Sequence, residues 1–239
     1  MMTTKAWLQE AAAKKAKEGS DEQREGGVRR WIYLTDGTPE AAEQAEPYAF
    51  PEVAQPPGGA KAYRESRKEG VRSFTLWADR YRQQVLAYVV TKSAAKGQAS
   101  MYEILGAAGE PLARVMRERA LQNGARTRWT VEQMGGPTLV GVKGNAFWWF
   151  VWWLILPLQI VMAVAALIGG DGLVARMPYR TKWKLDGQTV LYLKRGSLRA
   201  KADWWDPRVT AGLVALLKSY DGFSGKSWDE WGDPPEKAA

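Results

Sequence analysis

The chain has 239 residues, no Cys, no His and a formal net charge of +8. The absence of Cys and His excludes disulfides, thiol and imidazole catalysis, and nearly all zinc or haem sites, so we expect no cofactor. Its content of hydrophobic residues, 46%, excludes wholesale disorder and is sufficient for one or two domains.

The positive charge is unevenly distributed along the chain. Residues 1–60 hold 7 Lys or Arg against 10 Asp or Glu, so the basic excess belongs to residues 61–239. Lys and Arg close to a bilayer attract anionic head groups by about 1 kcal/mol each. Because no nucleic-acid motif or Lys/Arg-rich run occurs, we expect anionic membrane lipids, and not nucleic acid, as the partner.

Residues 1–70 differ in composition from the rest of the chain. Thr4–Glu18 is rich in Ala and Lys and predicts a short helix. Residues 19–70 are rich in Gly, Pro, Glu and Ala, and apart from the apolar patch Trp31–Leu34 they are typical of a linker. We therefore expect residues 1–70 to form an N-terminal helix followed by a flexible arm.

Runs of β-prone residues begin near Val71. The first two are Phe74–Trp77 and Val85–Thr91, and three two-strand units follow. These units are Met101–Leu105 with Pro111–Val115, Thr127–Val131 with Thr138–Val142, and Thr181–Leu185 with Thr189–Leu193. Asp186-Gly187 between two such runs is a strong hairpin signal. The pattern predicts a β-domain in two parts, residues 71–145 and 171–223.

The last two units resemble each other. Arg126-Thr127-Arg128-Trp129 and Arg180-Thr181-Lys182-Trp183 occupy the same place in each hairpin. Alternation along a strand places Thr, Trp and an aliphatic residue on one face and the basic residues on the other. The sequence therefore indicates a repeated hairpin.

Ala146–Ile168 is a run of 23 residues without a charge. As a straight helix it would span roughly 34 Å, enough for a hydrocarbon core of about 30 Å. Trp148, Trp149, Trp152 and Trp153 cluster at one end, where an aromatic belt belongs. We predict that residues 146–170 insert into a membrane through these tryptophans and Pro157.

Three modes are open for this segment. Pro157 breaks or bends a helix, which would allow two half-helices to dip into one leaflet and return to the same side. A single span and a buried helix of a soluble core are the alternatives. Basic residues flank both sides, so the positive-inside rule gives no direction. Those predicted to contact lipid head groups are Lys143, Arg176, Arg180, Lys182 and Lys184. The alternative is that these basic residues simply form the solvent-exposed face of a strand.

A second helix is predicted near the C-terminus. Asp206-Pro207 provides a capping carboxylate and Pro at the first helical position, the body runs from Arg208 to Tyr220, and Asp221-Gly222 ends it. Its interior is apolar or small on nearly every side, so it must be enclosed. An antiparallel β-barrel of hairpins around it would satisfy this need, with residues 224–239 as a polar tail.

This order of elements resembles the tubby C-terminal-like superfamily, which includes LURP-one-related proteins and phospholipid scramblases. The resemblance covers about residues 85–222 and rests on the successive two-strand units and on Asp206-Pro207-Arg208 leading into an apolar helix. It implies an antiparallel barrel closed around that helix, and binding to membranes or phosphoinositides. The long apolar insert departs from the usual pattern of that superfamily.

Three classes of function follow from these features. We expect a non-enzymatic lipid-binding module at the cell membrane, with its soluble parts facing the cytoplasm. The alternative is a membrane-anchored adaptor that recruits a protein partner through the N-terminal arm or a Trp-rich surface formed by Trp204, Trp205, Trp228 and Trp231. An enzyme is disfavoured because the acids Asp203, Asp206, Asp229 and Glu230 match no catalytic motif. The sequence sets no oligomeric state.

Overall fold

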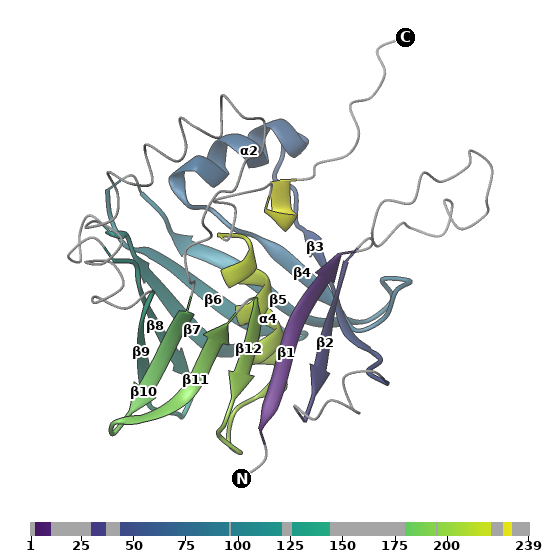
Figure 1. The fold of residues 1–239 in the computed structure, drawn as a ribbon. Coiled ribbons are helices and arrows are strands. Elements are labelled where there is room, and N and C mark those ends of the chain that lie inside the picture. Colours follow the sequence, from purple (N-terminus) through teal and green to yellow (C-terminus); the bar gives the residue numbers. More distant parts are fainter. Residues whose placement is uncertain are drawn as a thin grey trace, which may run out of the picture.

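The computed structural model describes residues 3–10, 30–36, 44–95, 97–120, 126–143, 180–194, 196–220 and 227–230. These residues form twelve antiparallel strands in a closed barrel with one helix inside it (Figure 1). Each strand pairs with its neighbours in the chain, and β1 pairs with β12 to close the barrel. The predicted fold, mainly β with an antiparallel barrel, is confirmed.

The strands are β1 (Thr4–Glu10), β2 (Arg30–Thr35), β3 (Pro47–Val53), β4 (Phe74–Trp77), β5 (Val85–Ser93), β6 (Ser100–Gly106), β7 (Pro111–Glu118), β8 (Arg128–Gln133), β9 (Thr138–Lys143), β10 (Arg180–Leu185), β11 (Gln188–Lys194) and β12 (Ser197–Ala200). The described helices are α2 (Gly59–Glu69), α4 (Pro207–Lys218) and the short 3-10 helix η3 (Trp228–Glu230).

The two similar hairpins lie next to each other in the barrel wall. Trp129 on β8, Gly141 on β9 and Trp183 on β10 stand in one cross-strand row, and both indoles are buried in the interior. The Trp183 indole donates a hydrogen bond to the Trp129 carbonyl at 3.1 Å. A Cβ on Gly141 would lie 2.7 Å from the Trp183 ring, so glycine gives this ring its space.

Helix α4 fills the barrel, as its composition predicts. The Asp206 carboxylate accepts a hydrogen bond from the Arg208 N–H at 2.7 Å, and Pro207 occupies the first turn. All nine residues from Val209 to Leu217 are buried. The helix touches strands on several sides, among them β1, β2 and β5. The predicted stop at Asp221-Gly222 lies outside the described residues.

The prediction of a helix from Thr4 to Glu18 is wrong for its first part. Residues 4–10 form β1, which pairs with β12 on one side and β2 on the other. Two ladders of backbone hydrogen bonds and the burial of Ala6 outweigh local helix propensity. Residues 11–18 lie outside the described part of the chain.

The flexible arm predicted for residues 19–70 is also wrong where the structure describes it. β2, β3 and α2 all fall in this range. Two of the glycines that the structure describes lie at helix ends: Gly58, with φ of 101°, precedes α2, and Gly70, with φ of 110°, ends it. Glycine tolerates these left-handed conformations, so Gly58 and Gly70 mark the two ends of a helix.

Residues 146–168, with Trp148, Trp149, Trp152, Trp153 and Pro157, lie outside the described residues, as does Arg176. Among the residues that the structure does describe, no helix is long and apolar enough to cross a membrane. Insertion of this segment therefore stays a prediction.

Candidate functional site

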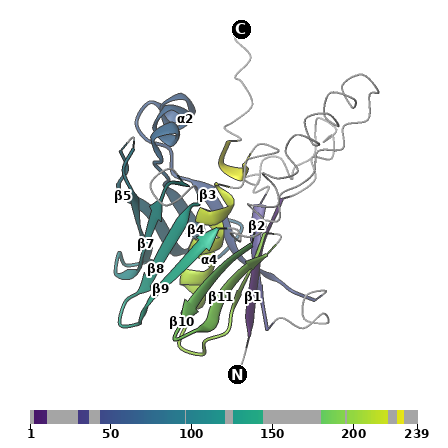
Figure 2. The same ribbon diagram turned by 60° about the vertical axis from the view of Figure 1, so that its left-hand side comes forward.

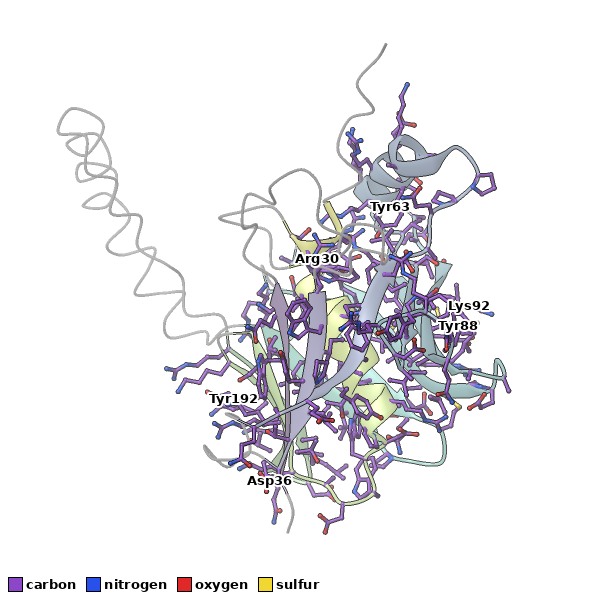
Figure 3. All side chains as sticks on the ribbon, turned by 90° about the vertical axis from the view of Figure 1, so that its right-hand side faces the viewer. Arg30, Asp36, Tyr63, Tyr88, Lys92 and Tyr192 are labelled. Atoms are coloured by element: carbon purple, nitrogen blue, oxygen red, sulfur yellow. The ribbon has the colours of Figure 1, made fainter. Side chains whose placement is uncertain are left out.

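The two ends of the barrel are built differently. Helix α2, η3 and the C-terminal end of α4 lie together at one end, which we call the α2 end (Figure 2). In Figure 3 the labelled Arg30 and Tyr63 lie at this end, and Asp36 lies at the opposite end. Because neighbouring strands are antiparallel, β7, β9 and β11 finish at the α2 end, and β8 and β10 begin there.

A buried ionic cluster fixes η3 to the α2 end. The Asp229 carboxylate, with no exposed side-chain surface, receives the guanidinium groups of Arg67 at 2.7 Å and Arg72 at 3.2 Å. The Tyr63 hydroxyl donates to the same carboxylate at 3.1 Å. Burial, followed by the Asp229 charge, raises the pKa of Tyr63, which keeps it a donor. This cluster holds two cations and one anion. It also positions Trp228, whose indole N–H donates a hydrogen bond to the Ala215 carbonyl oxygen at 2.8 Å.

Tyr220, just beyond α4, connects this cluster to the barrel wall. The guanidinium carbons of Arg72 and Arg117 each lie 4.2 Å from the centroid of its ring. Its hydroxyl donates to the Gly70 carbonyl at 3.0 Å and also contacts the Tyr102 hydroxyl. The ring of Tyr220 is therefore fixed between two cationic side chains.

Arg117 has an unusual environment for a charged residue. It points inward from β7, in the row of Trp129, and its guanidinium lies 5.7 Å from the Trp129 ring. Its buried Nε has no hydrogen-bond partner among the described residues. Burial lowers the pKa of Arg117, although a guanidinium stays protonated at neutral pH. Arg117 is thus a partly buried cation that lies against aromatic rings, without a carboxylate partner in the described part of the chain.

A small pocket opens next to Arg117. Thr127, Lys143, Thr181 and Leu193 stand in one row across β8 to β11, and all four line it. Trp129 and Tyr220 form aromatic walls, and Leu217 of α4 contributes apolar surface. The lining residues that the structure describes include two cations and three hydroxyl groups, those of Thr127, Thr181 and Tyr220, but no carboxylate.

Charge divides the barrel along its axis. Basic residues on α2 and at strand or helix termini of the α2 end are Arg30, Lys61, Arg64, Arg67, Lys68, Arg72, Lys92, Arg117, Arg119, Arg126, Arg128, Lys143, Arg180, Lys194 and Lys218; the carboxylates whose side chains the structure describes there are Glu52, Glu65, Glu69, Glu118 and Asp229. At the opposite end the acids are Asp36, Glu46, Asp79, Glu110, Glu132, Asp186, Asp203 and Asp206, and the bases are Lys5, Arg80, Arg82, Lys184, Arg199, Lys201 and Arg208. The α2 end is therefore strongly basic, whereas acids and bases nearly balance at the opposite end.

The structure separates the predicted head-group residues. Arg180, Lys182 and Lys184 point outward along β10 and are exposed, as alternation predicts, with Arg180 at the α2 end and Lys184 toward the opposite one. Lys143 instead faces into the pocket. Arg117 was not identified from the sequence. The sequence does hold a signal for it. Arg117 follows Val115 by two residues, and alternation along a strand places both side chains on the inward face of the barrel.

The predicted Trp-rich surface is largely wrong. Trp205 and Trp228 are buried, because both pack against α4 and its surroundings, whereas Trp204 remains 42% exposed. Trp231 lies outside the described residues. Of the acids considered, Asp206 caps α4 and Asp229 is buried in the ionic cluster. No group of acidic residues suited to a metal ion occurs among the described residues.

Comparison of the chain with protein-family models, curated proteins and solved structures gives no match.

Proposed function

We propose that this protein is a non-enzymatic, membrane-associated module that presents the α2 end of its barrel to anionic lipid. The observation that carries the proposal is that the basic end of the barrel is also the end from which the apolar segment departs. β9 ends there at Lys143, and β10 begins there at Arg180. Insertion of residues 146–168 would bring the Lys and Arg of this end close to the head groups, where their attractions add.

The register of β9 and β10 supports a re-entrant segment over a single span. Lys143 lies opposite Thr181 in an antiparallel pair, so the chain leaves and returns at neighbouring positions. After a single crossing, residues 169–179 would have to cross back while carrying Asp171 and Arg176. Each charge at the bilayer centre costs at least about 2.5 kcal/mol. We therefore propose that residues 146–168 enter and leave the membrane from one side.

The resemblance to the tubby C-terminal-like superfamily adds support. It implies an antiparallel barrel around an apolar C-terminal helix, which is the architecture described above. We propose the cytoplasmic face of the cell membrane as the location. The adaptor alternative has less support, because β1, β2, β3 and α2 lie in the proposed recruiting arm and two of the four tryptophans are buried.

Vesicle binding of the full-length protein tests the lipid proposal. We expect binding to phosphatidylcholine vesicles that contain phosphatidylserine, and weaker binding as salt is raised. The double variant Arg180→Glu with Lys182→Glu, at the α2 end and on the outer face of β10, should bind more weakly by on the order of tenfold. Lys201→Glu at the opposite end is the matched control and should have little effect. Equal binding to neutral and anionic vesicles would exclude the proposal.

Cysteine labelling tests the re-entrant arrangement, since the natural chain has no Cys. Thr138→Cys and Gln188→Cys introduce exposed thiols before and after the apolar segment. In intact cells, we expect both to be protected from an impermeant thiol reagent, and both to react after the cells are opened. Reaction of only one of them in intact cells would show that the segment spans the bilayer.

A further inference from the structure

We propose that the outer face of β10, β11, β12 and β1, which we call the basic wall, binds single-stranded nucleic acid. Each outward side chain there alternates along its strand with a buried one. Five of its six cations are exposed and one, Lys5, is half-buried. The six are Lys5, Arg180, Lys182, Lys184, Lys194 and Arg199. This proposal goes beyond the proposed function, which uses the α2 end of the barrel and not its side.

The first argument is that the basic wall carries charge of one sign. On the adjacent strands β9, β10, β11, β12, β1 and β2, none of the side chains that the structure describes is a carboxylate. Within the described part of the chain, none of the six cations forms an ion pair. On the opposite wall, by contrast, Lys92 and Arg114 both pair with Glu103, and Arg128 lies 3.9 Å from Glu118. The charge of the basic wall is therefore available to an anionic partner.

The second argument is that strand register places like charges directly opposite each other. Arg180 faces Lys194 across β10 and β11, and Arg199 faces Lys5 across β12 and β1. Like charges at such positions destabilise a sheet. A surface that needs only to be soluble achieves this with both signs interspersed. A polyanion bound along the wall would offset the repulsion in both pairs, so the register indicates a polyanionic partner.

The third argument is that aromatic rings lie in the same cross-strand rows as the cations. One row is Lys182, Tyr192, Arg199 and Lys5, and the next is Arg180, Lys194, Ser197 and Trp7. Tyr192 and Trp7 are both partly exposed. The Nζ atom of Lys182 lies 5.7 Å from the centroid of the Tyr192 ring, and that of Lys5 lies 5.1 Å from the Trp7 ring. Surfaces that bind single strands combine cations that follow the backbone with rings on which bases stack.

The shape of the wall favours a single strand over a bilayer or a duplex. The wall is part of a closed barrel and is convex (Figure 1), so a flat bilayer would touch only a narrow strip of it. A flexible strand can follow the curve, and its unpaired bases leave their faces free for stacking. The sequence shows no Lys/Arg-rich run because the cations come from four strands near both ends of the chain, and only the register brings them together.

Fluorescence anisotropy tests the wall with a labelled oligothymidylate of about 15 nucleotides and the full-length protein in non-ionic detergent. We expect binding that weakens as salt is raised, by about 0.7 in the log–log slope for each phosphate neutralised. Lys184→Gln with Arg199→Gln, the wall variant, should lower the affinity by on the order of tenfold and reduce the slope by up to about 1.4. The matched control, Lys61→Gln with Lys68→Gln, removes the same charge from exposed positions of α2 and should change neither.

Tyr192→Leu tests stacking separately from charge. Leucine keeps an apolar side chain at this position but removes the ring, so we expect the affinity to fall by at least about fivefold with an unchanged salt slope. Tyr88→Leu is the matched control, because Tyr88 is also half-exposed and lies on the opposite side of the barrel (Figure 3). Its affinity should equal that of the natural protein.

Four results would each overturn the proposal: no binding of the oligonucleotide by the natural protein, equal affinity for a duplex of the same length, equally strong competition by polyglutamate, or equal losses in the wall variant and the α2 control. Phosphatidylserine vesicles distinguish this proposal from the proposed function. The wall variant should bind them as the natural protein does, because Lys184 and Arg199 lie away from the α2 end. Weaker vesicle binding with unchanged oligonucleotide binding would instead assign the wall to lipid.

Discussion

At the scale of single residues, Asp229 holds the described C-terminal segment to the barrel. Its carboxylate has no exposed surface and lies between two guanidinium groups, which come from α2 and from the turn before β4. Removing the charge leaves Arg67 and Arg72 close together without their shared anion. The loss of one partner of a buried pair is far costlier than the loss of an exposed one.

We therefore predict that Asp229→Asn lowers the free energy of unfolding by about 3 to 5 kcal/mol. Arg114→Gln, which removes an exposed ion pair with Glu103 at 3.5 Å, should cost less than about 1 kcal/mol. Urea unfolding followed by tryptophan fluorescence measures both. Equal stability of the two variants would show that Asp229 is not required to hold η3 in place.

Asp79 stabilises the loop between β4 and β5 in a pH-dependent way. Burial raises its pKa, but hydrogen bonds from the backbone N–H groups of Gln84, Gln83 and Tyr81 outweigh this, and the net effect is a lowered pKa. A lowered folded-state pKa contributes stability that is fully present above the unfolded value of about 3.9 and is lost as pH falls through the folded value.

The expected result is that Asp79→Asn lowers the melting temperature at pH 7, and that its difference from the natural protein shrinks below about pH 4. Thermal unfolding over a pH series measures this difference. A difference that stays constant across the series would mean that the charge of Asp79 has no part in stabilising the loop.

At the scale of elements, the paired hairpins depend on a glycine. Gly141 lies between Trp129 and Trp183 in the cross-strand row, and an added Cβ would meet the Trp183 ring at 2.7 Å. The ring cannot move away easily because it is fully buried and its indole is bonded to the Trp129 carbonyl.

Gly141→Ala should accordingly destabilise the protein by about 1 to 3 kcal/mol through overpacking and should change the near-ultraviolet circular dichroism of the tryptophans. Thr138→Ala on the same strand, at an exposed position, should change neither property. An unaltered dichroism spectrum in Gly141→Ala would indicate that the two hairpins do not pack as described.

The sequence predicts well those elements whose signal lies within a few neighbouring residues. The hairpins from Met101 onward combine alternation with turn residues, and α4 has a capping Asp206 before Pro207; each of these signals acts within a few residues. β1 has no such signal, because its partners are β2 and the far more distant β12. The pocket was missed for the same reason. Arg117, Lys143 and Thr181 come from three strands, and only register brings them together.

At the scale of the whole molecule, β1 closes the barrel. Even this first strand therefore has one face toward the interior and one face toward solvent. Ala6 is fully buried and Gln9 is exposed, although the two lie three residues apart. If this segment formed a solvated helix, as the local sequence predicts, Ala6 and Gln9 would tolerate a charged side chain almost equally well.

Ala6→Asp should therefore reduce stability by several kcal/mol or prevent folding, because it buries an unpaired carboxylate. Gln9→Asp, with the same new side chain at an exposed site of the same strand, should cost less than about 1 kcal/mol. Soluble yield and thermal unfolding distinguish the two variants. Similar behaviour of both would contradict the closed barrel.

The pairing of Thr4 with Ala200 also sets an order of events during synthesis. A ribosome releases β1 first, and β12 follows only after nearly the whole barrel has been made. At about 5 to 20 residues per second, the interval is roughly 10 to 40 s, which is longer than the milliseconds to seconds that finished β-proteins need to fold. Throughout this interval both margins of the growing sheet present unpaired backbone groups to other chains. The pace of translation, and not the folding rate of the completed chain, determines how long that exposure lasts.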